Sequence, residues 1–128
     1  MIELYSVIYN KLKEYTDRVF EVNNVPQDTV FPYITFYMPS VSDIEQMDRI
    51  IIEINIWDRN KSGYDVLTVI ETLTDDIHNG VKKYKYIDSN IAVRFEFVNR
   101  LVYNNPEPED KNVCRRELRF EARTFFTN

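Results

Sequence analysis

The most regular pattern in the chain is an alternation of apolar and polar residues, which is typical of β-strands with one buried face. Isoleucine occupies every second position from Ile50 to Ile56, so we expect a central strand whose isoleucine face is fully buried. The stretch Ile91–Tyr103 alternates in the same way. The final stretch, Val113–Phe126, separates apolar from charged residues: Leu118, Phe120 and Ala122 fall on one face, and Glu117, Arg119, Glu121 and Arg123 on the other.

Two other stretches repeat apolar residues at helical spacing instead. The first runs from Ile2 to Tyr15, with its stripe at Tyr5, Ile8, Leu12 and Tyr15. The second carries its stripe at Val66, Ile70, Leu73 and Ile77, and Gly80 stands where a helix normally ends. Both patterns predict helices that pack one face against a sheet.

Shorter strands are expected between the first helix and the isoleucine strand. They are Arg18–Val22 and the β-branched, aromatic run Tyr33–Met38, which Pro39 should end. The predicted order is therefore α-β-β-β-α-β-β. This order indicates a single α+β domain over residues 1–128, with a mainly antiparallel sheet of about five strands and two packed helices.

Composition narrows the function classes. The net charge of −5 argues against a protein that grips nucleic acid, which needs lysine and arginine concentrated on one face. No apolar run approaches the ~20 residues that cross a bilayer, and the first residues lack the pattern of a secretory signal. One cysteine excludes an internal disulfide framework. We expect a soluble protein of a reducing cytoplasm.

The segment Asp58–Gly63 joins the isoleucine strand to the second helix and is the first candidate for chemistry. Its Lys61-Ser62-Gly63 resembles a shuffled phosphate loop, but such a loop needs several glycines, and a lysine just before a serine at the helix start. A plain corner explains the segment better. Asn60 or Ser62 would cap the helix, and Asp65 would lie favourably in its first turn.

Other catalytic candidates are weak. His78, the only histidine, is expected in the last helical turn, where a partly positive ring suits the helix dipole. A nucleophilic pair of Cys114 with His78 is conceivable, although packing is the commoner role of a strand cysteine. The carboxylates have no paired motif, and a nuclease-type metal site at Asp43 and Glu45 lacks a nearby lysine. We therefore expect no catalytic residue, metal site or cofactor.

Three features look suited to contact with other proteins. The charged row Glu117, Arg119, Glu121 and Arg123 is either a solvated sheet face, which is the commoner case, or a self-complementary edge between identical subunits. Trp57 is either a core residue or an interface anchor. The polar connection Pro39–Met47 is a candidate hairpin tip that reaches a neighbour, with loop contacts at Asp43, Glu45 and Asp48.

The chain also resembles a known family. "RVFEVNNVPQDTVFPYITFYM" is similar to a segment of the tail-completion proteins of long-tailed bacteriophages and prophages, also called tail-terminator or head-to-tail joining proteins. The resemblance continues through "IIIEINIWDRNKSGYDVLTVIETLTDDI" and closes with "VRFEFVNRLVYNNPEPEDKNVCRRELRFEARTFF". It covers nearly the whole chain, but its motifs are soft: Val25-Pro26-Gln27, Phe31-Pro32-Tyr33 and Ile56-Trp57. The acidic loop Asn104–Asn112 is a departure from the family pattern.

The resemblance implies a non-enzymatic, tail-terminator-like virion subunit. Such proteins form rings of six at the head-proximal end of the tail, so the expected partners are other copies of the chain, the tail-tube protein and the head connector or neck proteins. Assembly would take place in the host bacterial cytoplasm, and the finished ring would sit in the tail or neck of the virion, away from membranes. DNA would pass without specific binding, because an electronegative lumen repels its phosphates.

Other functions remain open from the sequence. A neck or connector adaptor of the same particle would bind the portal side without affecting tail length. A small hydrolase or nuclease would use Cys114 or the acidic residues. An interaction module of a toxin–antitoxin or other bacterial system is a third alternative.

Overall fold

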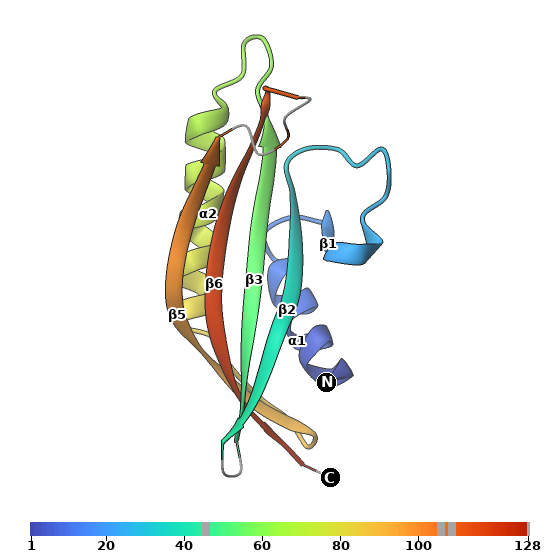
Figure 1. Cartoon of the computed structure of the whole chain (residues 1–128), viewed down its shortest axis with the longest axis vertical. Helices are drawn as coiled ribbons and strands as arrows, with labels where there is room; N and C mark the ends of the chain where they lie inside the picture. Colours follow the sequence, from blue (N-terminus) through green and yellow to red (C-terminus); the bar gives the residue numbers. More distant parts are fainter. Residues whose placement is uncertain (45–46, 105–106, 108–109, 128) are drawn as a thin grey trace.

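The computed structural model of the chain describes residues 1–44, 47–104, 107 and 110–127. Within this part of the chain, two helices lie behind a curved sheet whose four long strands run along the length of the molecule (Figure 1). The elements are, in order, α1 (Ile2–Leu12), β1 (Val19–Glu21), the 3-10 helix η1 (Val22–Asn24), β2 (Tyr33–Ile44), β3 (Met47–Arg59), α2 (Val66–Lys82), β4 (Lys85–Ile87), β5 (Ile91–Asn104) and β6 (Val113–Phe126). The α+β class with two packed helices is confirmed.

The described sheet has six strands in the order β1-β2-β3-β6-β5-β4. Every neighbouring pair is antiparallel except β1 and β2, which are parallel. The expected count of about five strands was therefore low by one. The missing strand is β4, whose three residues are too few to show an alternation. The last strand inserts between β3 and β5 rather than adding to an edge.

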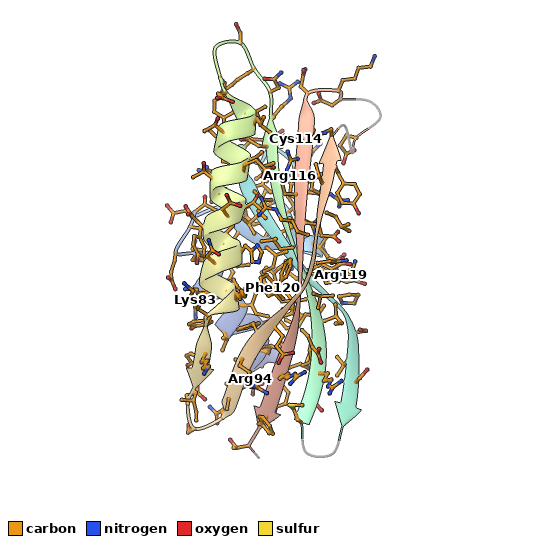
Figure 2. All side chains as sticks on the ribbon, turned by 90° about the vertical axis from the view of Figure 1, so that its left-hand side faces the viewer. Lys83, Arg94, Cys114, Arg116, Arg119 and Phe120 are labelled. Carbon is orange, nitrogen blue, oxygen red and sulfur yellow. The ribbon has the colours of Figure 1, made fainter. Side chains whose placement is uncertain are left out.

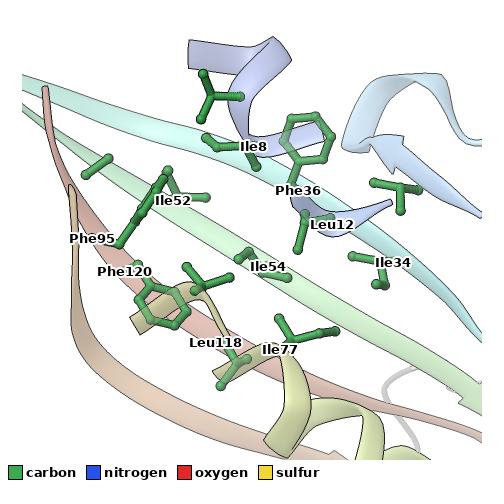
Figure 3. Packing of buried hydrophobic residues seen from close by; sticks show 14 of the residues in the cluster. Ile8, Leu12, Ile34, Phe36, Ile52, Ile54, Ile77, Phe95, Leu118 and Phe120 are labelled. Carbon is green, nitrogen blue, oxygen red and sulfur yellow. The ribbon is translucent and has the colours of Figure 1, made fainter. Parts of the chain in front are cut away.

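Both helices cover the same face of the sheet, and the hydrophobic core fills the space between the two layers (Figure 3). The isoleucines of β3 at 50, 52, 54 and 56 are each at most 1% exposed, which confirms the predicted buried face. Leu118 and Phe120 of β6 continue this layer beneath Ile77 of α2, while Ile8 and Leu12 of α1 cover the β2 side. Burial of each such side chain stabilises the fold by about 1.5–3 kcal/mol before entropy is counted.

The start and end of α2 differ from the sequence expectation. Asp65 is the N-cap, and its carboxylate accepts a hydrogen bond from the Thr68 backbone N–H at 3.1 Å. Neither Asn60 nor Ser62 caps the helix, because Gly63 turns the chain with φ of +72° after them. Gly80 lies inside the helix rather than at its end, and the Tyr15 hydroxyl lies where a side chain at position 80 would begin. Gly80 therefore leaves room for the Tyr15 side chain, which follows α1.

Pro39 does not end the second strand, contrary to the expectation. β2 continues to Ile44 and pairs with the first half of β3, so the polar connection is mostly part of a long hairpin arm. The register shifts between Tyr37 and Ser40, and this irregularity accommodates a proline that cannot donate a backbone hydrogen bond. The first helix is also shorter than expected, since it ends at Leu12.

Candidate interaction surface

The face of the sheet that turns away from the helices, called here the open face, is built from rows of residues in register across β2, β3, β6 and β5 (Figure 2). Side chains alternate between the two faces of each strand, so each row places four side chains next to one another. Figure 2 shows Arg119 on the side of the sheet away from α2. Five successive rows, from Trp57–Arg115 to Arg49–Arg123, carry the chemistry described below.

The first row is aromatic and contains a guanidinium group. It runs Tyr33, Trp57, Arg115, Tyr103 from β2 to β5. The rings of Tyr33 and Trp57 stack at 6.0 Å, and the Arg115 guanidinium lies 5.2 Å from the Trp57 ring and 4.0 Å from the Tyr103 ring. The Trp57 indole N–H donates to Thr35 Oγ1 at 3.0 Å. Trp57 is therefore half-buried within a cross-strand stack. It is not a core residue, and its exposed part is open to an interface.

The next rows form a lattice of ion pairs. Arg119 pairs with Glu53 on the neighbouring strand and with Glu117 at 3.2 Å. Arg123 pairs with Glu96 at 2.8 Å. Arg49 Nε and Glu121 Oε1 lie 3.2 Å apart, close enough for an ion pair but not aligned for a hydrogen bond. The charged row expected from the sequence is real, but its members pair mostly with charged residues of the neighbouring strands β3 and β5.

The row beyond these places three arginines side by side. Arg49, Arg123 and Arg94 are direct register partners on β3, β6 and β5. Like charges directly opposite one another destabilise a sheet, and here the diagonal glutamates offset part of that cost. In the described part of the chain, the buried side-chain polar atoms without a hydrogen-bond partner all lie on the open face: Nε of Arg49, Arg115, Arg119 and Arg123, Oδ1 of Asn55 and Asn99, and Oε1 of Glu121. Arg49 Nε and Glu121 Oε1 of this set pair with each other as ions, and the remaining atoms are open to water or a protein partner.

The charged row does not form an edge between subunits. β6 is paired along its length with β3 on one side and β5 on the other. Glu117, Arg119, Glu121 and Arg123 thus cannot offer an unpaired backbone, and Glu117 is only 5% exposed. An edge role for these four residues was the wrong interpretation, because alternation along one strand does not reveal that strand's position in the sheet.

The unpaired strand edges lie elsewhere. β1 pairs only with Ile34–Phe36, so the outer edge of β2 from Tyr37 to Ile44 has no described strand beside it. β4 pairs only with Ala92–Arg94, which leaves the outer edge of β5 from Phe95 to Asn104 unpaired in the same sense. Exposed valines stand on both segments: Val41 on β2, and Val98 and Val102 on β5. Long unpaired edges are templates for pairing with another chain.

A groove of about 740 Å³ opens between α1 and the β1–η1 segment. Its walls are apolar and aromatic: Ile2, Tyr5, Tyr9, Val19, Phe20 and Phe36. Asp17 and Glu21 also line it, and Glu21 accepts a hydrogen bond from the Asn23 backbone N–H at 2.9 Å. We call this feature the α1–β1 groove. It combines apolar surface with negative charge.

The structure does not bring Cys114 and His78 together. His78 stacks on Phe97 at 4.2 Å and also contacts Phe120, which lies six residues from Cys114 on β6, about 20 Å along an extended strand. Burial lowers the pKa of His78, with Arg100 and Lys82 adding to the effect, which disfavours the partly positive ring expected from the sequence. Burial and the nearby Asp58 raise the pKa of the Cys114 thiol, which disfavours the nucleophilic thiolate.

Hydrogen bonds hold the corner Asp58–Gly63, which joins β3 to α2. Asp58, 1% exposed, accepts hydrogen bonds from the Tyr64 hydroxyl at 2.6 Å and from the Arg59 backbone N–H at 2.8 Å. The Asn60 backbone N–H donates to the Asn112 carbonyl at 2.7 Å and ties the corner to the start of β6. Burial and Asp58 raise the pKa of Tyr64, so its phenol stays protonated. The segment is a hydrogen-bonded corner, as the sequence indicated.

The carboxylates form no group of three with histidine or cysteine that could hold a metal ion within the described residues. Of the expected loop contacts, Glu45 and the side chain of Asp43 fall outside the described part of the chain. Asp48 lies in β3, opposite Asp43 on one side and Thr124 on the other. Neither of the described helices is long and apolar enough to cross a membrane.

Comparison with known proteins gives one kind of match. No protein-family model matches the chain, and no curated protein matches its sequence. Among solved structures, a chain described as "Virion of native gene transfer agent (GTA) particle" is similar, with a TM-score of 0.62 and 13% sequence identity. The match covers 89% of this chain and 84% of that one. The two chains share a fold.

Several surface features could not be read from the sequence. The aromatic row needs four residues from four strands, and only Trp57 was singled out in advance. Tyr33, Arg115 and Tyr103 become partners through a register that depends on β6 inserting between β3 and β5. The α1–β1 groove likewise depends on how α1 lies beside a three-residue strand. The sequence offers one hint of the aromatic row: Tyr33, Trp57 and Tyr103 each lie near an end of a predicted strand.

Proposed function

We propose that this chain is a structural protein of a phage-like virion, where copies of it close into a ring at the head-proximal end of the tail. The ring ends the tail tube and joins it to the head connector. The observation that carries the proposal is the shared fold over 89% of the chain with a chain of a gene transfer agent virion. The soft motifs around Phe31-Pro32-Tyr33 and Ile56-Trp57 point in the same direction.

The sheet edges support a ring. The unpaired segments belong to β2 on one flank of the four long strands and β5 on the other. Contact between one flank and the opposite flank of the next copy is heterologous, and repetition of such a contact closes into a ring when the rotation allows it. If the β5 edge of one copy pairs with the β2 edge of the next, the sheet continues around the ring. We propose six copies, as in the family that the sequence resembles.

The charge of the open face bears on the passage of DNA. Its charged side chains on the four long strands are Arg49, Arg59, Arg94, Arg115, Arg119 and Arg123, with Glu53, Glu96, Glu117 and Glu121. This excess of positive charge does not make an electronegative lining, so the acids that repel DNA must lie outside the open face. Asp48, near the tip of the hairpin arm, is our candidate. Asp48→Lys should slow DNA ejection, and unchanged ejection kinetics would count against an electronegative lumen.

Interruption of the gene in its phage or prophage tests the proposed function. We expect lysates in which electron microscopy shows full heads apart from tails, with tails of uncontrolled length. Tails of normal length that fail to join heads would assign the chain to the connector side of the junction instead. Intact and infectious particles would refute a structural role and return attention to Cys114 and the carboxylates.

A further inference from the structure

A compact ridge of positive charge lies at the end of α2 and along β4. Lys82, Lys83 and Lys85 are all exposed, and Ile87 on the same side of β4 as Lys85 is 78% exposed. We call these four residues the lysine ridge. Figure 2 shows Lys83 beside the end of α2, on the helix side of the molecule. No ion pair within the described residues involves the three lysines.

The α1–β1 groove has the complementary chemistry. Asp17 and Glu21 line it without an ion pair in the described part of the chain, although the Glu21 carboxylate accepts hydrogen bonds from Asn23. Its apolar wall includes Ile2, which is 75% exposed. Ile87 on the ridge and Ile2 in the groove have the highest exposures found among the large hydrophobic residues of the described chain. Exposed apolar groups flanked by charge are typical of interaction sites.

One molecule cannot join its own ridge to its own groove along the sheet. β4 and β1 occupy the two ends of the strand order, and α1 lies between ridge and groove: its Lys11 ammonium is 4.8 Å from the Tyr84 ring, whereas its Ile2, Tyr5 and Tyr9 line the groove. The Lys13 ammonium lies over the Tyr9 ring and donates to the Asp17 backbone carbonyl at 2.9 Å, and no ion pair joins it to the Asp17 or Glu21 carboxylate in the described part of the chain. A basic ridge and an acidic groove at separate places on one surface fit a contact between successive copies, because such a contact repeats.

We propose that the lysine ridge of one copy docks into the α1–β1 groove of a second copy. Ile87 enters the apolar part of the groove, and Lys83 and Lys85 approach Asp17 and Glu21. This inference rests on the proposed ring and adds the residues of its contact. The charges set the orientation and the rate of encounter, and the burial of Ile87 against Tyr5 and Phe20 holds the contact together.

Charge reversal and rescue in the full-length protein test the contact. Lys83→Glu with Lys85→Glu should weaken self-association about tenfold or more, measured by sedimentation velocity at low salt. Asp17→Lys with Glu21→Lys should do the same, and the four changes together should restore association. Lys61→Glu with Lys111→Glu is the matched control, since it makes the same charge change at exposed sites away from ridge and groove. Glu21 caps η1, so Glu21→Lys alone could weaken association by disturbing η1. Asp17→Lys leaves this cap intact and should weaken association on its own.

The outcomes separate this inference from the proposed function. A wild-type chain that associates while both reversals leave it unchanged overturns the ridge–groove contact and leaves the ring standing. A wild-type chain that stays monomeric overturns the contact, and interruption of the gene then decides the ring. Loss of association in both reversals without rescue in the combined variant also overturns the pairing, provided circular dichroism shows that the combined variant is folded.

Discussion

At the scale of single residues, the buried cation Arg116 shows how the helix layer is held to the sheet. Arg116 is 3% exposed and pairs with Glu71 of α2. Glu71 also accepts from Arg100 at 2.6 Å, and Arg100 reaches Asp75 at 2.7 Å. One glutamate therefore serves two guanidinium groups from two neighbouring strands. Removal of its charge leaves Arg116 buried without a counter-ion.

We expect Glu71→Gln to destabilise the protein by about 2 kcal/mol. This is less than the ~3–5 kcal/mol for breaking a fully buried pair, because the Glu71 side chain is 37% exposed and water screens it. Denaturant unfolding measures the loss. Glu96→Gln is the matched control, since Glu96 forms an exposed pair with Arg123 on the open face and should cost under about 1 kcal/mol. Equal losses in the two variants would show that burial of Arg116 does not decide the cost.

His78 should make the fold sensitive to acid. Its folded-state pKa lies below its ordinary value of 6.5 because of burial and the charges of Arg100 and Lys82, which the nearby Asp75 opposes. Below that pH the unfolded chain binds the proton more readily, so stability falls as pH drops through about 6.5. His78→Phe keeps a ring on Phe97 without titration. The free energy of unfolding of His78→Phe relative to wild type should rise as the pH is lowered from about 8 to about 5.5. A difference that stays constant over this range would show that His78 does not cause the acid sensitivity.

The sequence predicted which side chains share a face, but not how deeply they are buried. Alternation placed Leu118 and Phe120 on the core face, and both are fully buried. The same alternation assigned Glu117 to the opposite face, where it is nonetheless 5% exposed. Its burial depends on Arg119 and on the residues of the flanking strands, which come from distant parts of the chain. Sequence patterns along one strand carry no information about those neighbours.

At the scale of elements, the cap of α2 can be tested directly. Asp65→Ala should lower the free energy of unfolding and the midpoint of thermal denaturation, because the Thr68 N–H and hydroxyl lose their acceptor. Those hydrogen bonds also hold the pKa of Asp65 below its usual range, so the stabilisation is lost as the pH falls through that lowered pKa. Ser62→Ala is the control and should change neither quantity. A larger effect at Ser62 would place the cap where the sequence suggested.

Long periodic elements were predictable, and short or irregular ones were not. The bounds Val113–Phe126 were anticipated because the alternation from Glu117 to Arg123 lies at the centre of a long run without a turn residue. β4 was missed because three residues give none, and it forms only through its pairing with Ala92–Arg94. Pro39 predicts a strand end, whereas tertiary pairing with β3 extends β2 past it through a local shift in register. In each case a distant partner overrides local sequence.

At the scale of the whole molecule, the unpaired edge of β5 should take part in assembly. Val102→Asp puts a charge at an exposed position of this edge and should weaken self-association without loss of folding. Leu67→Asp is the matched control, since Leu67 is 60% exposed but belongs to α2 and not to an unpaired strand edge. Sedimentation velocity and circular dichroism on the same samples separate assembly from stability. Equal effects of the two changes would argue against an edge contact.

The α+β class follows from the sequence, but the order of the strands in the sheet does not. Five strand patterns and two helical patterns predict one sheet covered by one layer of two helices. The insertion of β6 between β3 and β5 depends on which buried faces match across the whole sheet. Because β6 lies between β3 and β5, the charged row is at the centre of the open face and not at an edge. The unpaired edges belong to β2 and β5. The candidate surface therefore had to be found in the structure.

The central claim is that this chain forms a closed ring within a virion, and electron cryomicroscopy of purified particles tests it most directly. We expect density for a ring of this chain between the tail tube and the head connector, with β5 of one copy facing β2 of the next. Purified, infectious particles whose junction is complete without this chain would contradict the claim.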